Sequence, residues 1–247
     1  MHLRACLKSD VVRKIGISFL DMLFPLFCLG CGAHGKYLCD SCLEIFPRRL
    51  KQRCPTCLKK ITPHGEACFD CSYKNALDGL FAASLYRSPL VSASIHTFKY
   101  NFIPSLALPL GSLLAERIIE IDLPLPDICI PVPLHSKRLR FRGFNQSELL
   151  AEAFVNALTP GLDIPLLKNS LLRTRYTKPQ MKTHTKEERL KNLTAAFTCT
   201  KEAISLLQGK SIWLIDDVST TGTTLEECAL ALKNAGAKNV FGIVLAR

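Results

Sequence analysis

Residues 216–223 place two carboxylates next to a series of hydroxyls and a single glycine. Adjacent carboxylates are poor phosphate ligands, but they accept hydrogen bonds from sugar hydroxyls or from waters on a magnesium ion. Hydroxyls around a glycine suit a phosphate, because glycine lets the backbone N–H groups approach the anion closely. We therefore expect this segment to bind a ribose and a phosphate together, through Asp216, Asp217, Ser219, Thr220, Thr221, Gly222 and Thr223.

The residues on either side of this segment predict how it is positioned. The apolar run 212–215 predicts a strand buried on both faces of a parallel sheet. From Thr224 onward apolar residues recur at helical spacing, and Gly236 is placed to end that helix before a second apolar strand over 240–245. The hydroxyl-rich loop would thus lie at a helix N-terminus, where unpaired N–H groups and the helix dipole favour an anion.

Residues 212–224 resemble the phosphoribosyl pyrophosphate motif of type I phosphoribosyltransferases over its whole length. The resemblance implies that phosphoribosyl pyrophosphate binds here with Mg²⁺. The main alternative is a structural turn whose hydroxyls only cap the following helix. A nucleoside triphosphatase would also need a P-loop, and Gly209-Lys210-Ser211 lacks the upstream glycine and precedes its strand.

Residues 28–71 contain four Cys-x-x-Cys pairs, a spacing typical of zinc knuckles. Eight thiolates predict two tetrahedral sites, and because thiolates would fill every position the zinc ions would be structural. Sequential pairing of the knuckles is the simplest arrangement, with cross-braced pairing as the alternative. The predicted ligands are Cys28, Cys31, Cys39, Cys42, Cys54, Cys57, Cys68 and Cys71.

A second strand-loop-helix unit precedes the acidic one, with a strand over 127–134, a basic loop and a helix over 145–158. We also expect a strand over 78–87 and helices over 90–100 and 106–121. Repeated units of this kind predict a parallel α/β sheet with helices on both faces and ligands beyond the strand C-termini. The basic loop would take a pyrophosphate, with Mg²⁺ bridging, through Lys137, Arg138 and Arg142.

Composition divides the chain of 247 residues into three parts. We expect a short amphipathic helix over 1–27, a double zinc ribbon over 28–75 and a phosphoribosyltransferase-like domain over 76–247. The apolar stretch 15–29 is too short to span a bilayer and is interrupted by Asp21 and Pro25, so no transmembrane segment is expected. No export signal is recognised either, which predicts a cytoplasmic protein that uses its cysteines for metal rather than disulfides.

The net charge of +11 is concentrated in part on residues 135–191, which carry twelve Lys or Arg against five Asp or Glu. Such a basic surface suits a pyrophosphate or a nucleic-acid backbone. Phe141 and Phe144 are interleaved there with Arg140 and Arg142 and could stack on bases, with core packing as the alternative.

The chain as a whole resembles the ComF family of competence-related, GntX-like proteins. The resemblance rests on the cysteine pairs, on Pro131-Val-Pro-Leu134 and Arg142-Gly-Phe-Asn-Gln146, and on the C-terminal motif. Further matches are Lys99, Tyr100, Arg173, Gln180, Arg189, Asn192 and Phe197. The resemblance to this family implies a protein that acts in DNA uptake, handles single-stranded DNA and has competence-machinery proteins as partners. Residues 173–192 would correspond to the loop that closes over substrate in type I phosphoribosyltransferases, with a surface linker as the alternative.

In a catalytic version of this site, pyrophosphate would leave the anomeric carbon of the ribose. Asp216 and Asp217 would hold the ribose hydroxyls, while Arg138, Arg142 and Mg²⁺ would stabilise the leaving group. We identify no acceptor pocket and no catalytic residue, so enzymatic activity stays open. The alternatives to a competence role are an active phosphoribosyltransferase on an unidentified nucleobase or other acceptor, and a non-catalytic sensor of phosphoribosyl pyrophosphate.

Overall fold

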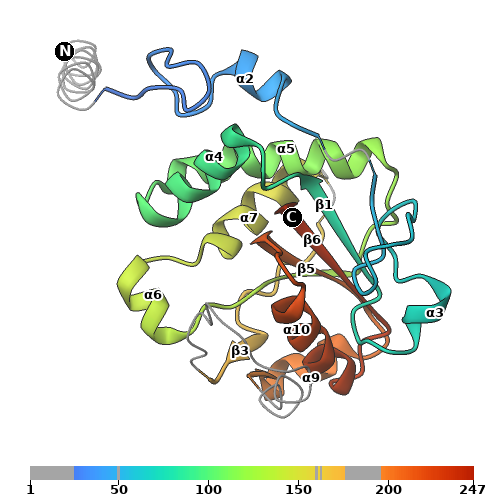
Figure 1. Ribbon diagram of the computed structural model, residues 1–247. Helices are drawn as coiled ribbons and strands as arrows, with labels where there is room; N and C mark the ends of the chain where they lie inside the picture. The colour runs from blue at the N-terminus through green and yellow to red at the C-terminus, as the bar shows by residue number, and fades with distance from the viewer. Residues whose placement is uncertain (1–24, 49–50, 159–160, 162, 176–195) are drawn as a thin grey trace, which may run out of the picture. The chain divides into compact units, whose positions relative to one another are not determined.

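The computed structural model describes residues 25–48, 51–158, 161, 163–175 and 196–247 (Figure 1). The chain divides into two compact units, Met1–Phe46 and Pro47–Arg247. The amphipathic helix expected over 1–27 lies almost wholly outside the described residues.

The described part of the first unit is a small turn-rich segment. Its one described helix, α2 (Asp40–Glu44), follows a tight turn in which Phe27 and His34 form an isolated antiparallel bridge. Gly32 and Gly35 adopt positive φ values of 73° and 106°, which side chains with a Cβ rarely tolerate. These bends bring residues distant in sequence together in a segment with little apolar core.

The second unit is built on a four-stranded, all-parallel sheet with the strand order β1-β6-β5-β2. The apolar runs expected to form strands do so, although the strands expected over 78–87 and 127–134 are both shorter than expected. The strands are β1 (Gly79–Ser84), β2 (Ile128–Pro131), β5 (Ser211–Val218) and β6 (Asn239–Ala246). Because all four strands run in the same direction, their carboxyl ends meet at one edge of the sheet.

Helices cover both faces of this sheet, as predicted (Figure 1). On one face Phe154 packs against Trp213 with ring centroids 6.1 Å apart. On the other face Leu225, Cys228 and other apolar residues of a single helix join the main hydrophobic core. The helices of the first face are α4 (Pro89–Tyr100), α5 (Ala107–Glu120) and α7 (Gln146–Leu158), and those of the second are α9 (Lys201–Leu207) and α10 (Thr223–Asn234).

The basic segment after β2 differs from the prediction, because it is a helix rather than a loop. Helix α6 (Ser136–Arg142) has no buried residue, so no apolar pattern in the sequence predicts it. It is held at its ends instead: the His135 imidazole accepts a hydrogen bond from the Lys137 N–H (3.2 Å), and Gly143 ends it in the left-handed conformation.

A short antiparallel pair, β3 (Leu171–Arg173) and β4 (Phe197–Cys199), flanks the segment expected to close over substrate. Arg173 therefore lies in a strand rather than in a loop. Gln180, Arg189 and Asn192 lie outside the described residues.

The second cysteine module, residues 51–75 with the short helix α3 (Phe69–Ser72), belongs to the same compact unit as the sheet. It hydrogen-bonds along the edge of β1 that does not pair with β6. The Gly65 carbonyl accepts from the Leu80 N–H (2.9 Å), and the buried Gln52 amide bonds both backbone groups of Ala82 (3.0 and 3.2 Å). The module thus covers an otherwise open sheet edge.

Candidate functional site

The acidic pair lies at the carboxyl end of β5 and is held from two helices. Lys99 of α4 forms an ion pair with Asp217, with Nζ and Oδ2 2.8 Å apart. The Ser147 hydroxyl, in the first turn of α7, donates to Asp216 Oδ1 (2.7 Å). Asp217 is almost completely buried, with 1% of its surface exposed. Contacts from two helices therefore fix the orientation of the two carboxylates.

Burial and neighbouring charges shift the pKa values of Asp216 and Lys99. Burial raises the pKa of Asp216 to about 7, and the charge of Asp217 adds to the rise, while Lys99 and Ser147 oppose it. Burial alone would lower the pKa of Lys99, but the charges of Asp217 and Asp216 raise it above its ordinary value. Lys99 is therefore a stable cation, and Asp216 is the carboxyl whose charge changes near neutral pH.

The hydroxyl-rich loop leads directly into α10, as predicted. Gly222 precedes the helix with φ +83°, a conformation that favours glycine. A Cβ at Gly222 would lie 4.0 Å from Ser219 Oγ and 3.9 Å from Arg247 Nη2. Ser219 is 4% exposed, and its hydroxyl has no hydrogen-bond partner in the described part of the chain. By contrast Thr220, Thr221 and Thr223 are exposed, with the last two hydroxyls 2.8 Å apart.

The basic residues predicted to bind pyrophosphate lie on α6, which follows the neighbouring strand β2. Arg142 donates to Gln146 Oε1 (2.6 Å) and lies over the ring of Tyr100, 5.4 Å from its centroid. Burial and the like charge of Arg138 lower the pKa of Arg173, and the charge of Asp216 opposes this shift. Lys99 and Tyr100 are consecutive residues of α4, so the end of this helix contacts both the acidic pair and Arg142. Lys137 is exposed.

The two aromatic residues of the basic segment have different environments. Phe144 packs against the buried Phe98 with centroids 6.0 Å apart. Phe141 is 80% exposed and lies near Phe102, with centroids 6.1 Å apart. Tyr100 is also exposed and lies beneath Arg142, which follows Phe141 in the chain; we call the exposed rings of Tyr100, Phe102 and Phe141 the aromatic cluster.

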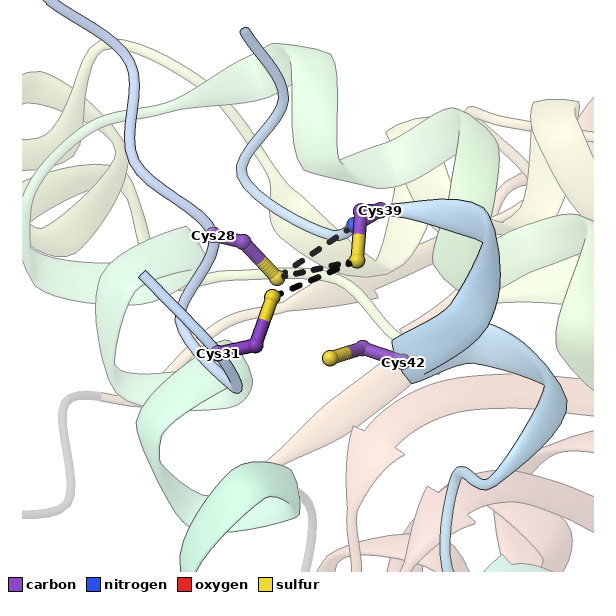
Figure 2. A group of neighbouring side chains, drawn as sticks. All are labelled: Cys28, Cys31, Cys39 and Cys42. Carbon is purple, nitrogen blue, oxygen red and sulfur yellow. Dashed lines mark hydrogen bonds between the residues drawn. The ribbon is translucent and has the colours of Figure 1, made fainter. Parts of the chain in front are cut away.

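The eight predicted metal ligands form two groups, paired sequentially along the chain rather than cross-braced. Figure 2 shows the thiols of the first group pointing toward one another. Within each group the sulfur atoms lie within 4.8 Å of one another. A tetrahedral ion with Zn–S bonds of about 2.3 Å separates its ligands by about 3.8 Å, so both groups fit zinc. The groups are Cys28, Cys31, Cys39 and Cys42, and Cys54, Cys57, Cys68 and Cys71.

Three contributors to the site come from outside the predicted set. Lys99 is indicated only by the family resemblance, which gives it no role. Ser147 and Arg247 carry no sequence signal, because the contact of Ser147 with Asp216 and the position of Arg247 beside Gly222 depend on how α7 and β6 pack.

Comparisons with known proteins agree with this architecture. Residues 19–72 match the double zinc ribbon domain, and residues 149–247 match the phosphoribosyl transferase domain. The fold and the cysteine groups therefore define a zinc-ribbon protein with a phosphoribosyltransferase-type domain, in which the zinc sites are structural.

Similarity over most of the chain defines the family more closely. The chain is 32% identical to the DNA utilization protein YhgH of Salmonella typhi, over 82% of this chain and 87% of the relative. It is 31% identical to Competence protein F of Haemophilus influenzae, over 85% and 90%. It is 29% identical to Competence protein ComFC of Streptococcus pneumoniae, over 85% and 87%. The chain belongs to the ComF family. Among the residues that the structure describes, no helix is both long and apolar enough to cross a membrane.

Proposed function

We propose that this protein binds phosphoribosyl pyrophosphate with Mg²⁺ and acts in the cytoplasm in DNA uptake, by handling single-stranded DNA. The observation that carries the ligand assignment is the Ser219 hydroxyl, in the loop before α10, which is buried and has no hydrogen-bond partner among the residues that the structure describes. Burying an unsatisfied hydroxyl costs about 1–3 kcal/mol. A phosphate held by the loop would satisfy it, together with the unpaired N–H groups of the helix.

Different residues would bind different groups of the ligand. The 5-phosphate would sit in the loop of residues 219–223, and the ribose hydroxyls would donate to Asp216 and Asp217. Arg138 and Arg142, with the neighbouring Lys137, would face the pyrophosphate from α6. The carboxylates fit a hydrated Mg²⁺, because their oxygens accept hydrogen bonds from its waters; when bound, the ion would add positive charge next to the pyrophosphate.

The DNA assignment is supported by the exposed aromatic cluster of Tyr100, Phe102 and Phe141. Exposed rings beside cations offer stacking surfaces that accept unpaired bases of any sequence. The names of the relatives, DNA utilization protein and Competence protein, point to the same process. Other proteins of the competence machinery are the expected macromolecular partners.

An active transferase and a non-catalytic sensor would both use this ligand site. The two differ in a single observable, because only a transferase releases pyrophosphate when an acceptor is supplied. The assignments above concern binding, and none of them names an acceptor base.

Thermal unfolding tests the ligand assignment. A ligand that binds only the native state at 100 times its Kd stabilises it by about 2.7 kcal/mol. Phosphoribosyl pyrophosphate with Mg²⁺ should raise Tm, and ribose 5-phosphate should raise it less because it lacks the pyrophosphate. Ribose, which lacks both, is the control. A Tm unchanged by phosphoribosyl pyrophosphate up to millimolar concentration would rule out the proposed site.

A further inference from the structure

Arg247, which follows β6, connects the second cysteine module to the phosphate loop. Its backbone is fixed at the end of β1, because its N–H donates to the Ser84 carbonyl (3.2 Å) and its carbonyl accepts from the Tyr86 N–H (3.1 Å). Its guanidinium donates from Nη2 to the Pro55 carbonyl (3.1 Å). The same Nη2 lies 3.9 Å from the Cβ position of Gly222. One side chain therefore touches the module and borders the loop.

We expect the position of the Pro55 carbonyl to depend on metal. Pro55 lies between two ligands of the second group, Cys54 and Cys57, and Cys54 is completely buried. A knuckle of this kind holds its backbone by chelation, so loss of the ion would release the carbonyl that Arg247 bonds.

A second connection joins the same two parts. Glu226, in the first turn of α10, accepts hydrogen bonds from the N–H groups of Ala76 (2.6 Å) and Leu77 (3.1 Å), at the exit of the module. Through the side chain of Glu226, the helix whose N-terminus faces the proposed phosphate is thus bonded to the residues that directly follow the zinc module. These contacts all lie within the second compact unit.

We propose that Arg247 is a contact for the 5-phosphate, and that the second zinc site holds Arg247 in place. The proposal rests on the proposed function and adds a cation to it. Residues 219–223 contain no Lys or Arg, and two carboxylates precede them. The loop itself therefore provides no positively charged side chain for a phosphate. A planar guanidinium with several N–H donors suits phosphate oxygens. The buried hydroxyl of Ser219 and Arg247 flank Gly222 together.

The first test measures affinity for ribose 5-phosphate by calorimetry in wild type, Arg247→Met and Lys238→Met. Lys238 is exposed and precedes the same strand at its opposite end, so its substitution removes an equal charge far from the loop. Arg247→Met should weaken binding at least tenfold, Arg247→Lys by less, and Lys238→Met hardly at all. Circular dichroism and Tm show whether each variant is folded.

The outcomes separate this proposal from the proposed function. Binding by wild type with equal affinity in folded Arg247→Met would overturn the role of Arg247 and leave the ligand site intact. If wild type binds neither ribose 5-phosphate nor phosphoribosyl pyrophosphate, both proposals are overturned; if it binds only phosphoribosyl pyrophosphate, the role of Arg247 alone is overturned. Equal losses in Arg247→Met and Lys238→Met would indicate a general charge effect and would also overturn the specific contact.

The second test follows the release of zinc. Because binding free energies are linked reciprocally, a ligand held by Arg247 should stabilise the second zinc. We expect this stabilisation to appear as slower release of that zinc to a chelator, measured with a colorimetric indicator. The Cys31→Ser variant identifies which release phase belongs to the first group. Ribose 5-phosphate should slow the second-group phase in wild type but not in Arg247→Met. Protection that persists in Arg247→Met, or no protection in a wild type that binds the ligand, would contradict the coupling.

Discussion

Lys99, in the last turn of α4, forms an ion pair with Asp217 at the end of β5, and the two charged atoms lie 2.8 Å apart. The side chain of Asp217 is only 2% exposed and that of Lys99 19%. Water therefore screens the pair poorly. The neighbouring residue on α4, Tyr100, is 55% exposed and belongs to the aromatic cluster. The end of a single helix thus contributes both to the proposed ribose site and to the proposed base-stacking surface.

Replacing Lys99 by methionine should destabilise the second unit strongly. The substitution leaves Asp217 buried without its partner, a change that costs about 3–5 kcal/mol in comparable pairs. Urea unfolding measures the loss. The control is Lys210→Met, which breaks an exposed pair with Asp127 and should cost about 0–1 kcal/mol. Equal losses of unfolding free energy in the two variants would show that the Lys99–Asp217 pair stabilises the protein no more than an exposed pair does.

Ligand affinity should increase with pH through about 7. Ribose hydroxyls and hydrated Mg²⁺ favour the ionised form of Asp216, and burial raises its pKa to about 7, so binding releases a proton below that pH. Calorimetry in buffers of different ionisation enthalpy detects the released proton. Phosphates of the ligand also titrate near pH 6, so Asp216→Asn is the control, and its smaller pH dependence isolates the carboxyl. Identical pH profiles would exclude this role for Asp216.

The stability of the unliganded protein, in contrast to its ligand affinity, should decrease as pH rises. The folded-state pKa of Asp216 lies above its ordinary value, so the stability that its protonation contributes is present at low pH and lost as pH rises through about 7. The difference in unfolding free energy between wild type and Asp216→Asn, measured at pH 6 and pH 8, should therefore shift in favour of the variant at pH 8. No shift would place the pKa outside this interval.

Loss of the second zinc should destabilise the edge of the sheet. Cys57→Ser removes a ligand, and the module that bonds β1 through Gly65 and Gln52 depends on the metal. We expect one zinc fewer per chain and faster hydrogen exchange at Leu80 and Ala82. Cys199→Ser, a half-buried cysteine outside both groups, is the matched control and should keep both ions. Unchanged exchange in Cys57→Ser would show that the edge is stable without metal.

Removing the exposed ring of Phe141 should weaken binding of unpaired DNA. Stacking of one base on an aromatic ring contributes about 1–3 kcal/mol, so Phe141→Ala should lower affinity about 5- to 150-fold. Fluorescence anisotropy with a labelled oligonucleotide at several salt concentrations measures it. Phe69→Ala is the matched control, because Phe69 is 88% exposed on the zinc module. If both variants bind as wild type does, the aromatic cluster is not the DNA surface.

Much of the sheet was predictable because its strands are continuous apolar runs bounded by polar residues. The run 212–215, for example, lies within β5 as expected. Helix α6 was not predictable from periodicity, because it buries no residue and depends on local caps at His135 and Gly143. The strands β3 and β4 are only three residues each, too short to show an alternating pattern.

The site was predictable where its residues are consecutive and unpredictable where they come from distant elements. Asp216 lies at the end of β5 and the loop of residues 219–223 follows that strand, so their order alone places them together. Lys99 and Ser147 reach the acidic pair from α4 and α7, and Arg247 reaches the loop from β6. Their positions depend on the strand order β1-β6-β5-β2 and on helix packing, which local sequence does not encode.

The central claim is that the carboxyl end of β5 binds phosphoribosyl pyrophosphate. It is tested most directly by calorimetric titration of the zinc-loaded protein with phosphoribosyl pyrophosphate and Mg²⁺, beside the Asp216→Asn/Asp217→Asn variant. We predict saturable binding by the wild type and at least a tenfold loss in a variant that circular dichroism shows to be folded. Absence of binding by the wild type, or equal affinity in the folded variant, would contradict the account.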